Sequence, residues 1–150
     1  MSHVIAVASG KGGVGKTLIT ASLAIALRRR GYTVLAVDAD MGMRNLDLLL
    51  GVQDEVFFDV YDVMKKHCKA ADALVPVGPA GDFLAASQKK TWEKADPKDF
   101  ARVISRLSEK YDYVLIDCPP GRDGAFKSAT SVAEKILFVV EPSWTSLRDA

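Results

Sequence analysis

Short apolar runs rich in β-branched residues alternate along this chain with segments in which apolar residues recur every three or four positions. A continuous apolar run is typical of a strand buried on both faces of a parallel sheet, and the wider spacing marks one face of a helix. Strands are predicted at residues 3–9, 33–38, 113–117 and 135–140, and helices at residues 18–30, 57–67, 97–107 and 124–133. This alternation predicts an α/β fold with a mostly parallel sheet and helices on both faces.

Local signals place the ends of several elements. Three arginines followed by Gly31 predict the end of the first long helix. Cations in the last turn offset the helix dipole, and glycine readily adopts the left-handed conformation just past a helix. Asp96 followed by Pro97 marks a helix start. Pro76 assigns its strand to the edge of the sheet. The shorter predicted elements are a helix at 46–50, a helical turn at 70–74, and strands at 74–77 and 82–86.

With 150 residues, 49% of them hydrophobic, the chain forms at most one domain with a substantial core. A net charge of +1 gives no overall bias toward nucleic acid or anionic membranes. Cys68 and Cys118 fit neither a paired metal motif nor a disulfide framework, and no apolar run reaches the ~20 residues of a membrane span. We therefore expect a cytoplasmic protein. Because the sequence stops at Ala150 inside a predicted helix, residues 1–150 are expected to be the N-terminal portion of a longer domain, incomplete at the C-terminus.

A glycine-rich loop that fits the pattern G-x-x-x-x-G-K-[ST] joins the first strand to the first long helix. It consists of Gly10, Lys11, Gly12, Gly13, Val14, Gly15, Lys16 and Thr17. Its glycines let backbone N–H groups approach an anion closely, and the helix N-terminus adds partial positive charge. We expect Lys16 to bridge the β- and γ-phosphates and the Thr17 hydroxyl to ligate Mg²⁺. The strand–loop–helix context thus predicts a P-loop.

The same glycines also fit a dinucleotide-binding pattern. Gly10, Gly12 and Gly15 match G-x-G-x-x-G, and Asp38 stands where a ribose-binding acid would lie. A dinucleotide site has no use for Lys16 and Thr17, so the mononucleotide interpretation is favoured.

Two predicted strands end in aspartate, at Asp38 and at Asp117, and Asp40 follows the first. The carboxyl ends of parallel strands form the ligand-binding edge of an α/β sheet, so these acids are expected beside the P-loop. Acids there can hold a magnesium-bound water or orient an attacking water. We expect Asp38 and Asp117 to complete the metal shell with Thr17, and Asp40 to position the water.

An ordinary P-loop needs no lysine directly after its first glycine. With Lys11 the loop resembles the deviant Walker A motif of the MinD/ParA ATPases, in which this lysine reaches across a nucleotide-sandwich dimer to the partner's phosphates. The run Gly42-x-Arg44-Asn45-Leu46-Asp47 and the tripeptide Ala86-Ser87-Gln88 resemble the MinD branch of that family. The resemblance covers the whole chain. It implies a P-loop NTPase fold, catalysis by Lys11 in trans, and contact of the Gly121 backbone N–H with the γ-phosphate.

Three residues depart from the family pattern. Leu18 stands where a second hydroxyl residue usually meets the α-phosphate, so nucleotide affinity or diphosphate release is expected to differ. Cys118 and Pro120 replace residues usual in MinD and are closer to Mrp-type iron–sulfur carriers. A proline beside Gly121 should stiffen this switch segment.

The resemblance implies Mg-dependent ATP hydrolysis that ends an ATP-dependent homodimer, with ATP and Mg²⁺ as ligands, regulatory protein partners and a role in division-site placement. Membrane association is expected only through a C-terminal amphipathic helix, of which residues 1–150 show no sign, and no specific nucleic acid is expected. Three alternatives stay open: a non-hydrolysing, nucleotide-gated adaptor, a ParA-type DNA-partitioning ATPase and an Mrp-type metal carrier.

Overall fold

The computed structural model describes residues 2–9, 15–41, 46–87, 90, 92–119 and 124–140, with the exception of the side chain of Leu48. The strands are β1 (His3–Ala8), β2 (Val34–Asp38), β3 (Val75–Pro76), β4 (Asp82–Leu84), β5 (Tyr113–Asp117) and β6 (Lys135–Phe138). The helices are α1 (Lys16–Arg29), α2 (Leu46–Leu50), α3 (Val60–Met64), α4 (Ala70–Ala73), α5 (Pro97–Ser108) and α6 (Gly124–Thr130). Short 3₁₀ turns lie at Gln53–Glu55, Gly78–Ala80 and Trp92–Lys94.

The strands form one sheet in the order β3-β4-β2-β5-β1-β6. The pairs β4–β2, β2–β5, β5–β1 and β1–β6 are parallel, and β3 runs antiparallel to β4 at the edge. The predicted mostly parallel sheet and the edge position of Pro76 are thereby confirmed. Because the central strands are parallel, Asp38 and Asp117, which end β2 and β5, are register partners. The carboxyl edge therefore brings together acids that lie far apart in the sequence.

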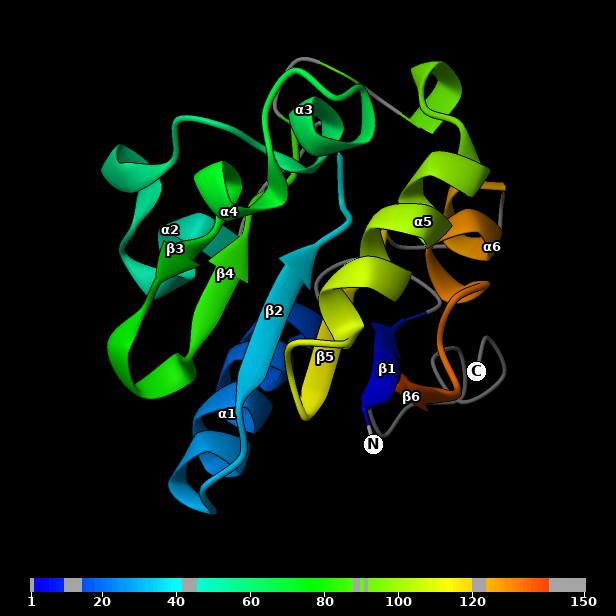
Figure 1. Ribbon diagram of the computed structural model, residues 1–150. Coiled ribbons are helices and arrows are strands. Elements are labelled where there is room, and N and C mark those ends of the chain that lie inside the picture. The colour runs from blue at the N-terminus through cyan, green and yellow to red at the C-terminus, as the bar shows by residue number, and fades with distance from the viewer. Residues whose placement is uncertain are drawn as a thin grey trace.

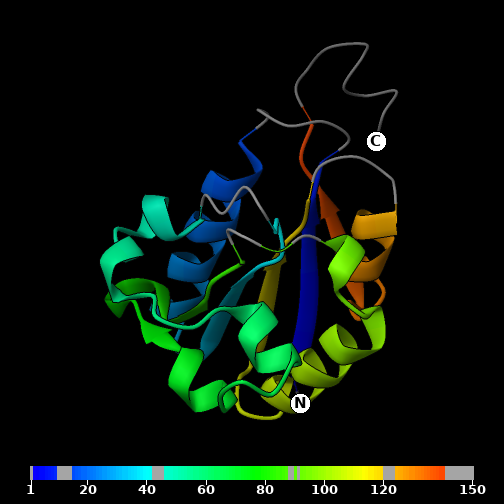
Figure 2. The ribbon, with the colours of Figure 1, turned by 90° about the horizontal axis from the view of Figure 1, so that it is seen from above.

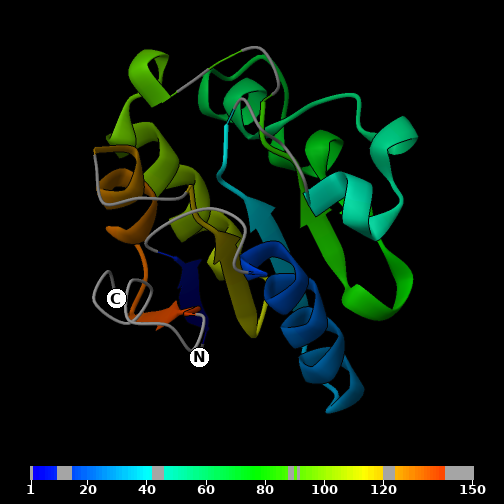
Figure 3. The same ribbon diagram turned by 180° about the vertical axis from the view of Figure 1, so that it is seen from behind.

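Helices cover both faces of the sheet. Figures 1 and 3 show α1 on one face and α5 and α6 on the other, and Figure 2 shows the sheet between these two layers. Apolar residues of β2 alternate between the faces: Ala36 packs with α1 and α2, whereas Leu35 and Val37 pack in the cluster that contains α5. The side of α5 that meets the sheet carries the predicted apolar residues Phe100, Val103, Ile104 and Leu107, all buried.

The predicted ends of α1 and α5 are confirmed. Gly31 lies just past α1 with φ of 90°, in the left-handed region that glycine adopts without steric cost. At α5 the carboxylate of Asp96 accepts a hydrogen bond from the Lys98 backbone N–H at 2.9 Å, and Pro97 is the first helical residue. Asp96 therefore satisfies one of the free backbone donors at the start of the helix.

Two predicted elements differ in the structure. The helix expected at 57–67 is confined to 60–64, because the carboxylates of Asp59 and Asp62 each accept a hydrogen bond from the other's backbone N–H and fix the helix start. Phe57 is consequently left outside the helix and 85% exposed. The strand predicted to be buried at 135–140 covers only 135–138 and is exposed there, with Ile136 46% accessible, because β6 pairs with β1 alone among the described strands. Val139, just past it, is buried. Within the described residues, no helix is long and apolar enough to cross a bilayer.

Candidate nucleotide-binding site

The N-terminus of α1 lies at the carboxyl edge of the sheet, beside the end of β5. Gly15 precedes the helix with φ of 81°, a left-handed conformation that turns the chain into its first residue, Lys16. The Lys16 side chain is 7% exposed, and its ammonium donates a hydrogen bond to Oδ1 of Asp117 at 2.5 Å. The neighbouring Thr17 hydroxyl donates to Oδ2 of the same carboxylate at 2.9 Å. Asp117 thus accepts hydrogen bonds from two residues of the predicted P-loop. Its position at the end of a buried strand predicts that it lies beside this loop.

Asp38 lies next to Asp117 on the adjacent strand and is fully buried. Its Oδ1 accepts a hydrogen bond from the Asp40 backbone N–H at 3.0 Å, and its Oδ2 accepts one from the Leu46 backbone N–H at 3.3 Å. One carboxylate therefore ties together the two ends of the segment that connects β2 to α2. Each oxygen keeps a further lone pair, so these contacts leave room for a hydrogen bond from a metal-bound water.

The electrostatics of the site follow from three carboxylates around one ammonium group. Burial, followed by the charge of Asp117, raises the pKa of Asp38 from 3.8 to about 7, although its two backbone N–H donors act in the opposite direction. Burial also raises the pKa of Asp40, while the Lys16 ammonium lowers it. The three acids would repel one another if all were ionised, so the site favours added positive charge.

Trp92 contributes to the site in a way that the sequence did not indicate. Its indole Nε1 donates a hydrogen bond at 2.7 Å to the carbonyl of Ala39, the residue between Asp38 and Asp40. The Ala39 backbone N–H in turn donates to the carbonyl of Asp117 at 2.9 Å. The indole also packs edge-on against Phe100 of α5, with ring centroids 5.1 Å apart. Trp92 therefore fixes the peptide that separates two of the predicted functional acids.

Other predicted site residues fall outside the described part of the chain: Gly10, Lys11, Gly12, Gly13, Val14 and Gly121. The expectations for their roles stay predictions. Leu18 is described, and its side chain is 59% exposed on α1.

The donor groups fit a magnesium ion. Mg²⁺ prefers oxygen ligands and is usually held in nucleotide sites by one or two protein oxygens together with phosphates and waters. The Thr17 hydroxyl and the Asp117 carboxylate lie side by side, with the Asp38 carboxylate on the next strand. Among the described residues, no group of three His, Cys, Asp or Glu side chains could hold a metal on its own. The Thr17 hydroxyl and these carboxylates therefore match the protein's share of a magnesium site in which phosphates and waters supply the remaining ligands.

Comparison with known proteins agrees with the geometry. Residues 2–149 match the sequence profile of the family described as AAA domain. The chain belongs to this family. Over its whole length it is 44% identical to the septum site-determining protein MinD of Helicobacter pylori and covers 57% of that protein.

Two solved structures place this AAA domain near MinD as well. The MinD of Pyrococcus horikoshii OT3, complexed with Mg-ADP, superposes with a TM-score of 0.89 at 40% identity, over 100% of this chain and 62% of that one. The MinD of an Aquifex aeolicus MinC:MinD complex superposes with a TM-score of 0.89 at 37% identity, over 99% of this chain and 60% of that one. The predicted MinD-like P-loop fold is thereby confirmed. The AAA domain described here spans less than two thirds of the length of these relatives.

Proposed function

We propose that this chain is the nucleotide-binding portion of a MinD-like ATPase, which binds ATP with Mg²⁺ and hydrolyses it. The observation that carries the proposal is the single carboxylate of Asp117 held between the Lys16 ammonium and the Thr17 hydroxyl. A lysine and a hydroxyl at the start of a helix, joined to an acid at the end of a neighbouring strand, are the parts by which P-loop proteins hold phosphates and metal. The Mg-ADP bound to the Pyrococcus horikoshii MinD supports the same ligand class here.

Each residue has a distinct part in this function. With nucleotide bound, Lys16 would donate to phosphate oxygens, and the Thr17 hydroxyl would turn from Asp117 toward the metal. Bound Mg²⁺ would neutralise charge that develops on the phosphate oxygens. Asp117 and Asp38, on neighbouring strands, would both accept hydrogen bonds from waters bound to the metal. Asp38 would also fix the backbone that carries Asp40. Asp40, half-exposed and close enough to Lys16 to be influenced by its charge, would orient the attacking water.

The wider biological part of the proposal rests on the relatives. We propose that the protein acts in division-site placement, as the names of the septum site-determining proteins that it resembles suggest. ATP would favour a homodimer, in which Lys11 of each chain reaches the partner's phosphates, and hydrolysis would end it. The MinC:MinD complex of Aquifex aeolicus supports regulatory protein partners. In the whole protein, we expect a cytoplasmic location, with membrane association only through a segment beyond residue 150.

Phosphate release from ATP by the full-length protein tests this function. Asp40→Asn should keep nucleotide binding but lower turnover, because only the water-orienting carboxylate is lost. Asp117→Ala should retain some nucleotide affinity yet lose its dependence on Mg²⁺, because the missing group serves the metal. Asp54→Asn, on an exposed turn, is the matched control and should hydrolyse ATP as the wild type does. Tight Mg·ATP binding without turnover, in the presence and absence of partner proteins, would instead identify a nucleotide-gated adaptor.

A further inference from the structure

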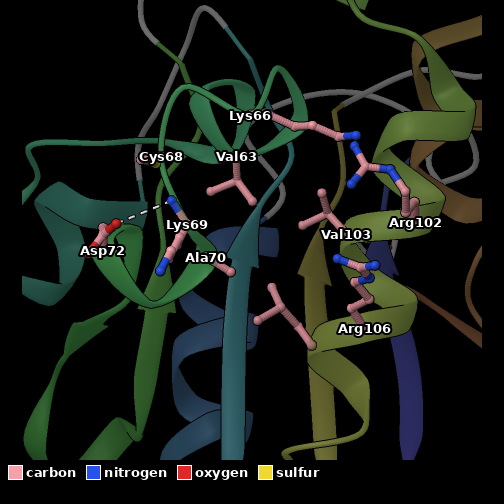
Figure 4. A pocket seen from close by; sticks show the side chains of 10 residues that line it. Val63, Lys66, Cys68, Lys69, Ala70, Asp72, Arg102, Val103 and Arg106 are labelled. Atoms are coloured by element: carbon pink, nitrogen blue, oxygen red, sulfur yellow. Dashed lines mark hydrogen bonds between the residues drawn. The ribbon is translucent and has the colours of Figure 1, made fainter.

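A cavity of about 600 Å³ lies between the α3–α4 segment and α5. Figure 4 shows its walls, which come from the α3–α4 turn on one side and from successive turns of α5 on the other. This cavity is on the sheet face opposite α1, whose N-terminus forms the nucleotide site. Its residues are therefore separate from those assigned to ATP. The lining residues are Val63, Lys66, Cys68, Lys69, Ala70, Asp72, Arg102, Val103, Arg106 and Leu107.

The lining combines an apolar floor with a basic rim. Val63, Val103 and Leu107 are buried and supply aliphatic surface. The lining also contains four cationic side chains but only one carboxylate, that of Asp72. The cations are Lys66, Lys69, Arg102 and Arg106. An Oδ2 atom of Asp72 already accepts a hydrogen bond from the Lys69 backbone N–H at 3.2 Å. The lining thus has an excess of positive charge over a surface that is otherwise apolar.

Only one of the four cations has an acidic partner within ion-pair distance among the described residues. Arg102 donates to the carbonyl of Met64 at 3.1 Å and lies 3.7 Å from a carboxylate oxygen of Asp99. For Lys66, Lys69 and Arg106, no carboxylate in the described part of the chain lies within ion-pair distance. Burial, followed by the charges of the nearby acids Asp62, Asp72 and Asp59, raises the pKa of the Cys68 thiol. The charge of these acids therefore reaches the cavity, but none of the three forms an ion pair with the four cations. Three of the four cations therefore remain available to a ligand.

Three of the four cations also converge, whereas the Lys69 ammonium points away from the two arginines. In Figure 4 the Lys66 ammonium and the Arg102 guanidinium point toward each other across the cavity mouth, and Arg106 lies one turn further along α5. Lys66 has φ of 61°, the left-handed conformation that often follows a helix, and its backbone N–H closes the end of α3 on the carbonyl of Val63 at 3.1 Å. Like charges that face one another are unfavourable, and an anion between them removes that repulsion. The turn that ends α3 thus presents the Lys66 charge where an anion would be stabilised.

We propose that this cavity binds a small soluble molecule that carries a phosphate group on an apolar or aromatic body. Arginine forks donate several hydrogen bonds to phosphate oxygens, and Lys66 adds a point charge beside them, with Lys69 at the rim. A dianion matches the surplus charge better than a single carboxylate does. The apolar floor would receive the body of the ligand, and the volume lies within the range of small-molecule sites. A concave site of this size suits a discrete molecule better than a flat membrane surface.

Cys68 provides a local test, because it lines the cavity and is half-buried whereas Cys118 is fully buried. In the full-length protein with its P-loop occupied by Mg·ADP, labelling of Cys68 by N-ethylmaleimide is followed by peptide mass spectrometry. We expect 1-naphthyl phosphate to slow this labelling saturably. Inorganic phosphate should require an about tenfold higher concentration, since it lacks the apolar body. Vesicles that contain phosphatidylglycerol form a separate arm and should give no protection.

Two triple variants separate a specific site from general charge effects. Lys66→Gln/Lys69→Gln/Arg106→Gln should weaken protection by about tenfold or more, because the phosphate loses its donors. Arg29→Gln/Arg30→Gln/Lys110→Gln removes the same charge at exposed positions elsewhere and should behave as the wild type does. Circular dichroism and urea unfolding check that both variants keep the fold, and protection is compared with the unliganded labelling rate of the same variant. Absence of protection by 1-naphthyl phosphate, equal loss in both variants, or protection by vesicles alone would overturn the proposal.

Discussion

Lys16, the first residue of α1, and Asp117, the last residue of β5, form a buried ion pair although 101 positions separate them in the sequence. Burial of two charges is costly, and the attraction between them offsets that cost only when further hydrogen bonds complete the site. Thr17 supplies such a bond to the second oxygen of Asp117. The pair therefore holds a positive and a negative charge in place at the edge of the sheet, where a phosphate and a metal would need them.

Loss of one partner of this pair should destabilise the nucleotide-free protein. We expect Lys16→Ala to lower the free energy of unfolding by about 3–5 kcal/mol, because the charge of Asp117 is left buried without its partner. Addition of Asp117→Asn should restore part of the loss, since the uncompensated charge is gone. Urea unfolding of both single variants and the double variant measures the coupling. Strictly additive losses would show that the two side chains do not interact.

Trp92 should matter for turnover more than for nucleotide binding. Trp92→Phe keeps a ring against Phe100 but removes the hydrogen bond to the Ala39 carbonyl, worth about 1 kcal/mol. The peptide between Asp38 and Asp40 would then be less well fixed, so kcat should fall several-fold while the nucleotide Kd stays close to that of the wild type. Trp92→Leu, which also loses the ring contact, should have the larger effect on stability. An unchanged kcat in Trp92→Phe would limit this residue to a packing role.

The stability of the nucleotide-free protein should depend on pH through Asp38. Its pKa is about 7 in the folded protein and 3.8 as an ordinary carboxyl, so the folded state holds the proton more tightly. The associated stabilisation is complete below about pH 4 and is lost as the pH rises through about 7. Asp38→Asn removes this titration. The free energy of unfolding of the variant, relative to that of the wild type, should therefore be higher at about pH 8 than at about pH 5. Urea unfolding at both pH values measures this difference, and the exposed Asp54→Asn is the control.

Lys11 is predicted to act on the partner chain. Lys11→Ala should leave nucleotide binding by the monomer within a small factor of the wild type. ATP-dependent dimerisation should be lost, and turnover should fall by about 10³–10⁵, the contribution of a positive charge supplied in trans to phosphoryl transfer. Sedimentation with ATP and a phosphate-release assay measure the two effects. A variant that dimerises and hydrolyses ATP normally would make Lys11 an ordinary loop residue.

The sequence predicted most of the strands, the long helices and the meeting of Asp117 with the P-loop, because a buried strand that ends in an acid has a fixed place in a parallel sheet. It did not predict the start of α3, where the reciprocal hydrogen bonds of Asp59 and Asp62 override the apolar spacing that begins at Phe57. The role of Trp92 was also missed. Its contact with Ala39 joins two loops 53 positions apart, and no periodic pattern encodes such a contact.

Calorimetric titration of Mg·ATP into the full-length protein and its Lys16 variants tests phosphate binding by the P-loop most directly. Lys16→Ala removes the ammonium, and Lys16→Gln keeps a hydrogen-bond donor for Asp117 so that the fold is preserved. Lys110→Ala removes an exposed charge as the control. We expect saturable binding by the wild type and Lys110→Ala, and none by either Lys16 variant. Binding of Mg·ATP to Lys16→Gln at wild-type strength would contradict the assignment of this loop as the nucleotide site.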